Sequence, residues 1–137
     1  MSSLAVAKVK GRNMANTVAS SALSVALKDG TQIACWRSGP GTLVLVHGST
    51  VDHTCWDGVL PDLEPYFTMY NVDRRGRGRS GDASTYAMER ESEDIAAVVD
   101  SIGGPVDVVG HSYGSNCALE AAQLTPNIAR LVLTSRW

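Results

Sequence analysis

The chain has 137 residues, of which 44% are apolar and 19% are charged, and its formal net charge is −2 at pH 7. This length and composition suit a single globular domain and exclude a disordered chain. The small net charge gives no general reason to expect a nucleic-acid partner, and no apolar run reaches the roughly 18 residues that cross a bilayer. Because Cys35, Cys55 and Cys117 have no metal-ligand or redox spacing, we expect free thiols in a reducing compartment.

The first 20 residues carry basic side chains followed by many small polar ones. Lys8, Lys10 and Arg12 are typical of the beginning of a signal peptide. Serine, threonine and asparagine interrupt the segment that follows, which makes a poor apolar core for such a peptide. We therefore expect residues 1–20 to be a disordered lead-in, or the protein to start nearer Met14. Residues 21–137 are expected to form one domain, and the protein is expected to be cytoplasmic.

Strands alternate with helices along the rest of the chain. The first two β-prone runs are separated by Lys28-Asp29-Gly30, and an Asp-Gly pair in this setting predicts a hairpin. Later runs are continuously apolar, which is typical of strands buried on both faces of a parallel sheet. Strands are expected at Ser21–Leu27, Thr31–Trp36, Thr42–Val46, Phe67–Val72, Val106–Val109 and Ile128–Leu133.

Three helices are expected between these strands. The clearest is indicated by Ile95, Val98 and Ile102, which recur at helical spacing, and by acidic residues near its N-terminal end that suit the helix dipole. The alternation predicts an α/β fold with a mostly parallel sheet of up to six strands and helices on both faces. The helices are expected around Trp56–Leu63, at Met88–Ile102 and at Tyr113–Leu124.

The sequence Gly110-His111-Ser112-Tyr113-Gly114 joins a buried strand to an alanine-rich helix. A serine hydroxyl is a poor nucleophile until it is presented clear of the backbone, and a sharp strand-to-helix turn presents it in that way. Gly110 and Gly114 remove Cβ atoms that would collide across so tight a turn. The alternative is an ordinary serine in a glycine-rich surface turn. The flanking strand and helix favour Ser112 as a nucleophile, with the N–H groups at the helix start facing a developing oxyanion.

An earlier buried strand ends in His47-Gly48-Ser49. With the serine turn, this pattern resembles the α/β-hydrolase family, in which a His-Gly loop follows the third strand. The resemblance implies that the backbone N–H of Ser49 joins that of Tyr113 in an oxyanion hole, with His47 and Gly48 shaping the loop. Taken alone, His47 could simply cap the loop through its ring.

The segment Asp73–Ser80 resembles the glycine-rich loop that follows the fourth strand in many members of the same family. That resemblance implies that Asp73 and Arg75 tie the loop down and are structural rather than catalytic. The arginines could instead form a phosphate or nucleic-acid patch, but their charge is local and no aromatic residues are interleaved. We therefore expect no nucleic-acid partner.

A serine hydrolase of this family needs an acid and then a histidine after the nucleophile. The residues after Ser112 include Glu120, which lies two turns into the helix and points away from the serine, but no histidine. His47 belongs to the oxyanion loop, His111 diverges from its neighbour, and only His53 has conceivable reach. A base must be held in place by a third group, so we do not expect His53 to act as one. The triad acid and histidine are missing from this chain.

Together the motifs predict the N-terminal part of a three-layer α/β-hydrolase sandwich, truncated after its sixth strand. By the resemblance, it is a serine hydrolase that acts through Ser112 on a small carboxylic-ester substrate, with no metal or organic cofactor and no membrane partner. The alternative is a non-catalytic binding module or an inactive fragment on the same scaffold. The last strand would then be an uncovered apolar edge open to self-association.

Overall fold

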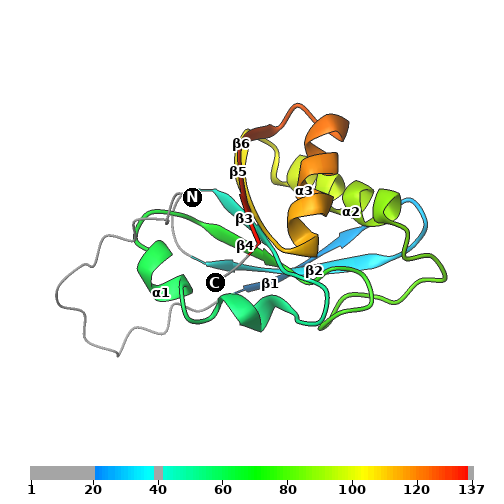
Figure 1. Cartoon of the computed structure of the whole chain (residues 1–137), viewed down its shortest axis with the longest axis horizontal. Helices are drawn as coiled ribbons and strands as arrows, with labels where there is room; N and C mark the ends of the chain where they lie inside the picture. The colour runs from blue at the N-terminus through cyan, green and yellow to red at the C-terminus, as the bar shows by residue number, and fades with distance from the viewer. Residues whose placement is uncertain (1–20, 39–41, 136–137) are drawn as a thin grey trace.

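The computed structural model describes residues 21–38 and 42–135, so the expected disordered lead-in lies outside the described residues. Six strands form one sheet in the order β1-β2-β4-β3-β5-β6 (Figure 1). All six coincide with expected strands to within a few residues. Their bounds are β1 Ser21–Ala26, β2 Gln32–Ser38, β3 Leu43–Val46, β4 Met69–Val72, β5 Val106–His111 and β6 Ile128–Thr134.

Strands β1 and β2 form the expected hairpin, and β2 also pairs antiparallel with β4. Gly30 takes φ 85° at the turn, where the Asp29 carboxylate accepts a 3.0 Å hydrogen bond from the Thr31 N–H. The remaining pairs, β3 with β4, β3 with β5 and β5 with β6, are parallel. The prediction of a mostly parallel sheet is confirmed.

In the described part of the chain, four helical segments connect the strands: η1 His53–Trp56, α1 Leu60–Leu63, α2 Met88–Ile102 and α3 Tyr113–Leu124. The bounds of α2 and α3 agree with those expected from the sequence. The expectation of one helix around Trp56–Leu63 is wrong, because the segment divides into two short turns. Asp52 caps the first turn by accepting from the Thr54 N–H, and Pro61, which has no N–H, stands at the start of the second.

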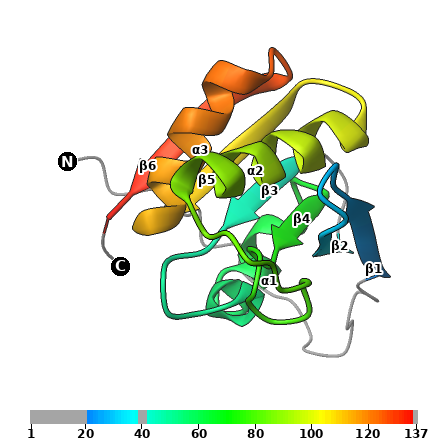
Figure 2. The same ribbon diagram turned by 90° about the vertical axis from the view of Figure 1, so that its right-hand side faces the viewer.

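Helices cover both faces of the sheet, as the sequence predicted. Figure 2 shows α2 and α3 side by side over one face of the sheet. Val44 and Val46 of β3 lie in one hydrophobic cluster with buried residues of these two helices. On the other face, Trp56 of η1 packs with Leu43 and Leu45 of the same strand. Strand β3 is continuously apolar because both of its faces are buried.

Among the described residues, β6 pairs only with β5 and stands at the edge of the sheet. Val132 and Leu133 on this strand are 38% and 45% exposed. In the described part of the chain, no helix is both long and apolar enough to cross a membrane.

Candidate active site

Ser112 lies between the end of β5 and the start of α3 and is exposed. Its backbone has φ 52° and ψ −123°, and it is the only non-glycine residue with positive φ in the described ranges. Such a conformation costs of the order of 1–3 kcal/mol and persists only where its surroundings enforce it. The turn therefore holds the serine hydroxyl out from the sheet at an energetic cost.

Two glycines allow the close contacts that enforce this turn. A Cβ on Gly110 would lie 2.6 Å from the Ser115 Cα, and one on Gly114 would lie 2.4 Å from the carbonyl oxygens of both Val46 and His47. These obstacles are backbone atoms, which cannot move aside. Gly114 thus lets the first turn of α3 rest directly on the end of β3.

The turn at Ser112, between β5 and α3, which we call the elbow, is also tied to β6. The Ser112 N–H donates to the Thr134 carbonyl at 2.7 Å. The Ser115 hydroxyl donates to the Gly110 carbonyl at 2.7 Å, and it accepts a 3.2 Å hydrogen bond from the Thr134 N–H. The backbone on both sides of Ser112 is therefore fixed by its neighbours.

The end of β3 brings Gly48 beside Ser112, since a Cβ on Gly48 would lie 3.3 Å from the Ser112 Cβ. His47 is fully buried, and its Nε2 accepts the Arg74 N–H at 3.0 Å. Because a backbone N–H can only donate, the ring proton is on Nδ1, which donates to the Gly48 carbonyl at 2.8 Å. Burial lowers the pKa of His47 to about 4, so the ring is neutral at pH 7.

Gly48 lies beside Ser112, and two peptide units at this point, Gly48–Ser49 and Ser112–Tyr113, have their carbonyl oxygens occupied by hydrogen bonds. The Gly48 carbonyl, in one peptide unit with the Ser49 N–H, accepts from His47. The Ser112 carbonyl, in one unit with the Tyr113 N–H, accepts from the Ser115 N–H at 2.9 Å. The described peptide bonds are all trans, so each N–H points away from its own carbonyl. Both peptide units thus keep a donor that can face a ligand.

The loop after β4 is anchored by Asp73 and Arg75, both buried. Asp73 accepts from the backbone N–H groups of His53 and Arg79, at 2.8 and 2.9 Å. The Arg75 guanidinium forms two hydrogen bonds with Asp94 of α2, at 2.6 and 2.7 Å, and these raise the pKa of Arg75 above its ordinary value. This pair of bonds ties the loop to the helical layer.

Sequence reasoning gave no individual role to Arg74, which is 4% exposed and contacts the site directly. Its guanidinium pairs with Glu91 of α2 and donates to the Gly48 carbonyl at 3.0 Å. Its central carbon also lies 4.8 Å from the centre of the Tyr113 ring. Position 74 is variable in the motif that the sequence resembles, so only the partners in space identify it.

No histidine in the described part of the chain is hydrogen-bonded to the Ser112 hydroxyl. His53 donates from its ring to Asp73 at 2.9 Å and stacks on Trp36 with ring centres 3.9 Å apart. The His111 ring lies edge-on to Trp56. Glu120 is exposed on α3. The described residues therefore present an exposed serine on the turn, with no described histidine hydrogen-bonded to its hydroxyl.

Asp52, His53 and Asp73 have potential metal-ligand atoms within 4.8 Å of one another. Asp73 Oδ1 already accepts two hydrogen bonds from His53, and the Asp52 carboxylate accepts two from Thr54. Internal hydrogen bonds therefore account for this group without an ion.

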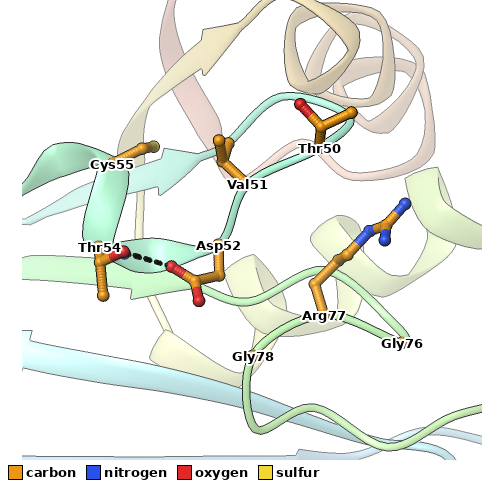
Figure 3. Close-up of a pocket in the computed structure, with 8 residues that line it drawn as sticks. All are labelled: Thr50, Val51, Asp52, Thr54, Cys55, Gly76, Arg77 and Gly78. Atoms are coloured by element: carbon orange, nitrogen blue, oxygen red, sulfur yellow. Dashed lines mark hydrogen bonds between the residues drawn. The ribbon is translucent and has the colours of Figure 1, made fainter.

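An open depression of about 460 Å³ lies beside the loop after β3 (Figure 3). Residues 50–52, 54 and 55 line one side, and residues 76–78 of the loop after β4 line the other. Ser112 is not among the lining residues, so this depression is adjacent to the site but does not contain it.

A mixed sheet covered by helices, with a serine on a strained strand-to-helix turn, defines the class of α/β proteins with a nucleophile elbow. A model of the Alpha/beta hydrolase family matches residues 43–136, and the chain belongs to this family. The α/β hydrolase from Sphaerobacter thermophilus DSM 20745 has 44% sequence identity and a TM-score of 0.75, and the match covers 81% of this chain and 44% of that one.

Curated relatives carry different names. The probable oxidoreductase EphD of Mycobacterium tuberculosis is 40% identical over 95 residues, which are 64% of this chain and 16% of that protein. The pimeloyl-[acyl-carrier protein] methyl ester esterase of Nitrosomonas europaea is 33% identical over 99 residues, which are 72% of this chain and 38% of the esterase. The chain spans less than half the length of these relatives.

Proposed function

We propose that Ser112 is the nucleophile of a serine hydrolase that acts on carboxylic esters. The observation that carries the proposal is the backbone of Ser112, which is held at positive φ with its side chain exposed. Strain of this kind concentrates at functional sites, and an ordinary surface serine would relax from it. The similarity to a methyl ester esterase supports an ester as the substrate.

In this proposal, the Ser112 oxygen attacks the ester carbonyl carbon, and the carbonyl oxygen becomes an oxyanion. The N–H groups of Ser49 and Tyr113 stabilise that oxyanion, helped by the positive end of the α3 dipole. Collapse of the tetrahedral intermediate breaks the bond to the alcohol and leaves an acyl group on Ser112. Water then releases the acid. The reaction so written uses no metal or organic cofactor.

The Ser112 hydroxyl must lose its proton to a base during attack, and no described histidine is placed to take it. This observation favours a second candidate, a non-catalytic binding module that keeps the scaffold and associates through the exposed edge of β6. The two candidates differ in whether Ser112 reacts when a base is supplied from solution.

Chemical rescue tests the difference. The 137-residue chain is treated with a fluorophosphonate, with and without imidazole, and the labelled peptide is found by mass spectrometry. Attack by Ser112 on phosphorus displaces fluoride, and imidazole accepts the proton. We expect slow labelling at Ser112 that imidazole accelerates, because a serine protease without a complete triad retains on the order of 10³-fold catalysis from its oxyanion hole and substrate binding.

The matched variants are Ser112→Ala and Ser101→Ala. Ser101 is exposed near the end of α2, so its loss should leave labelling unchanged. Ser112→Ala should abolish labelling. A folded chain that remains unlabelled in imidazole, or that labels equally without Ser112, would overturn the proposal and favour the binding module.

A further inference from the structure

Arg74 lies immediately behind the peptide unit that carries the Ser49 N–H. Its Nη2 donates to the Gly48 carbonyl at 3.0 Å and lies 3.4 Å from the Ser49 carbonyl. With the His47 ring, this gives the Gly48 carbonyl two donors on the side away from solvent. The plane of the Gly48–Ser49 peptide is therefore set by side chains, not only by the backbone path.

Arg74 is itself held firmly. Glu91, only 5% exposed, pairs with Nη1, and the Arg74 backbone N–H donates to His47 Nε2 at 3.0 Å. A guanidinium presents its donors in a rigid fork, so fixing one arm on Glu91 fixes the direction of the other. The arm that reaches Gly48 is thereby oriented from α2.

The same guanidinium packs over Tyr113, with its central carbon 4.8 Å from the ring centre. Tyr113 is the first residue of α3 and supplies the second N–H beside Ser112. One buried cation therefore contacts both segments that carry these N–H groups, although the segments are far apart in the sequence.

We infer that Arg74 is a positioning residue for the oxyanion hole, which aligns the N–H groups of Ser49 and Tyr113 with each other. This inference rests on the proposed function. Hydrogen bonds to a peptide carbonyl also polarise the peptide, which strengthens its N–H as a donor. Arg74 therefore acts on the Ser49 N–H in two ways, by direction and by polarity, without touching the substrate.

A purely structural role for Arg74 would predict only a change in stability, so the test must keep the fold. In the double variant Arg74→Met/Glu91→Leu, apolar side chains replace both members of the buried pair, a change that is often neutral or stabilising. The matched control is Arg90→Met/Glu93→Leu, which makes the same substitutions in an ion pair that is about half exposed on α2.

Two measurements are made on each folded variant. The first is the rate of fluorophosphonate labelling at Ser112 in imidazole, and the second is the NMR chemical shifts of the Gly48 carbonyl carbon and the Ser49 amide proton. We expect the double variant to label about 10- to 100-fold more slowly than the control, as when an oxyanion donor is weakened. Both chemical shifts should move upfield as the carbonyl loses a donor.

A double variant that folds, labels at the control rate and keeps both chemical shifts would overturn the role of Arg74. If the double variant does not fold, the labelling rate and both chemical shifts are measured on Arg74→Lys instead. One ammonium group cannot bind Glu91 and Gly48 together in the geometry of a guanidinium, so the same changes are expected. An unchanged labelling rate and unchanged chemical shifts in Arg74→Lys would then overturn the positioning role of Arg74. Failure of the unmodified chain to label refutes the proposed function instead, and the two failures are thus distinguishable.

Discussion

The elbow and the loop after β4 meet beside the same serine but are stabilised by different kinds of interaction. The elbow depends on close contact between backbones, for which Gly110 and Gly114 leave the space. The loop depends on buried charges, with Arg75 fixed by Asp94. The elbow should therefore be sensitive to added volume and the loop to lost charge, even though both set the geometry of one site.

The largest expected effect is on the charged loop. Asp94→Ala removes both short hydrogen bonds to Arg75 and leaves a buried guanidinium without its main partner. Breaking a buried pair in this way costs about 3–5 kcal/mol, which urea unfolding would measure. Glu93→Ala, an exposed neighbour on the same helix, should change the free energy of unfolding by less than about 0.5 kcal/mol. Equal effects would remove the contrast between the regions.

A methyl group should be enough to disturb the elbow. Gly114→Ala would place a Cβ 2.4 Å from two carbonyl oxygens of the β3 end, so helix and strand must separate. We expect a loss of about 3 kcal/mol in urea unfolding, at the upper end of ordinary overpacking. Gly104→Ala is the control, since its Cβ would meet nothing within 4 Å. A stable Gly114→Ala chain would show that the elbow is looser than its contacts imply.

His47 lies where the elbow and the loop after β4 meet, and acid should lower the stability of the chain through this residue. Its pKa is about 4 in the folded chain and near 6.5 when unfolded, so between these values the unfolded chain binds a proton that the folded chain excludes. The free energy of unfolding should fall by up to about 3 kcal/mol as pH drops from 6.5 to 4. Burial lowers the pKa of His111 too, which adds in the same direction. Asp29 and Asp52 have lowered pKa values and titrate below this window, whereas burial raises the pKa of Asp94, which acts in the opposite direction.

Urea unfolding at pH 7 and pH 4.5 checks the effect of His47, with His47→Gln as the variant that has no ring to protonate. The variant should be less stable at pH 7 but lose much less on acidification. The same pH dependence in both chains would assign the acid sensitivity to other groups.

Features that depend on local sequence were predictable. Helices α2 and α3 begin and end where apolar spacing and neighbouring glycine or proline indicate, and the Asp29-Gly30 pair marks the hairpin. The turn around Ser112 was also predictable, because its glycines, strand and helix adjoin one another in the chain. These signals act over a few residues, and tertiary packing reinforces them.

Features that depend on pairing across space were not predictable. Arg74 meets Glu91 and Gly48, which are 17 and 26 positions away, and no spacing rule joins a loop arginine to either. His53 was similarly ambiguous, since only the folded chain shows that its ring binds Asp73 and stacks on Trp36. Charged side chains whose partners are far away in the sequence produce little local sequence pattern from which their contacts could be predicted.

The hydrogen bond from the Ser112 N–H to the Thr134 carbonyl fixes the serine backbone to β6, the strand at this edge of the described sheet. Any event that shifts β6 along β5 would also rotate the backbone of Ser112 and change the direction of its hydroxyl. The position of β6 and the geometry of the turn at Ser112 are therefore coupled through this hydrogen bond.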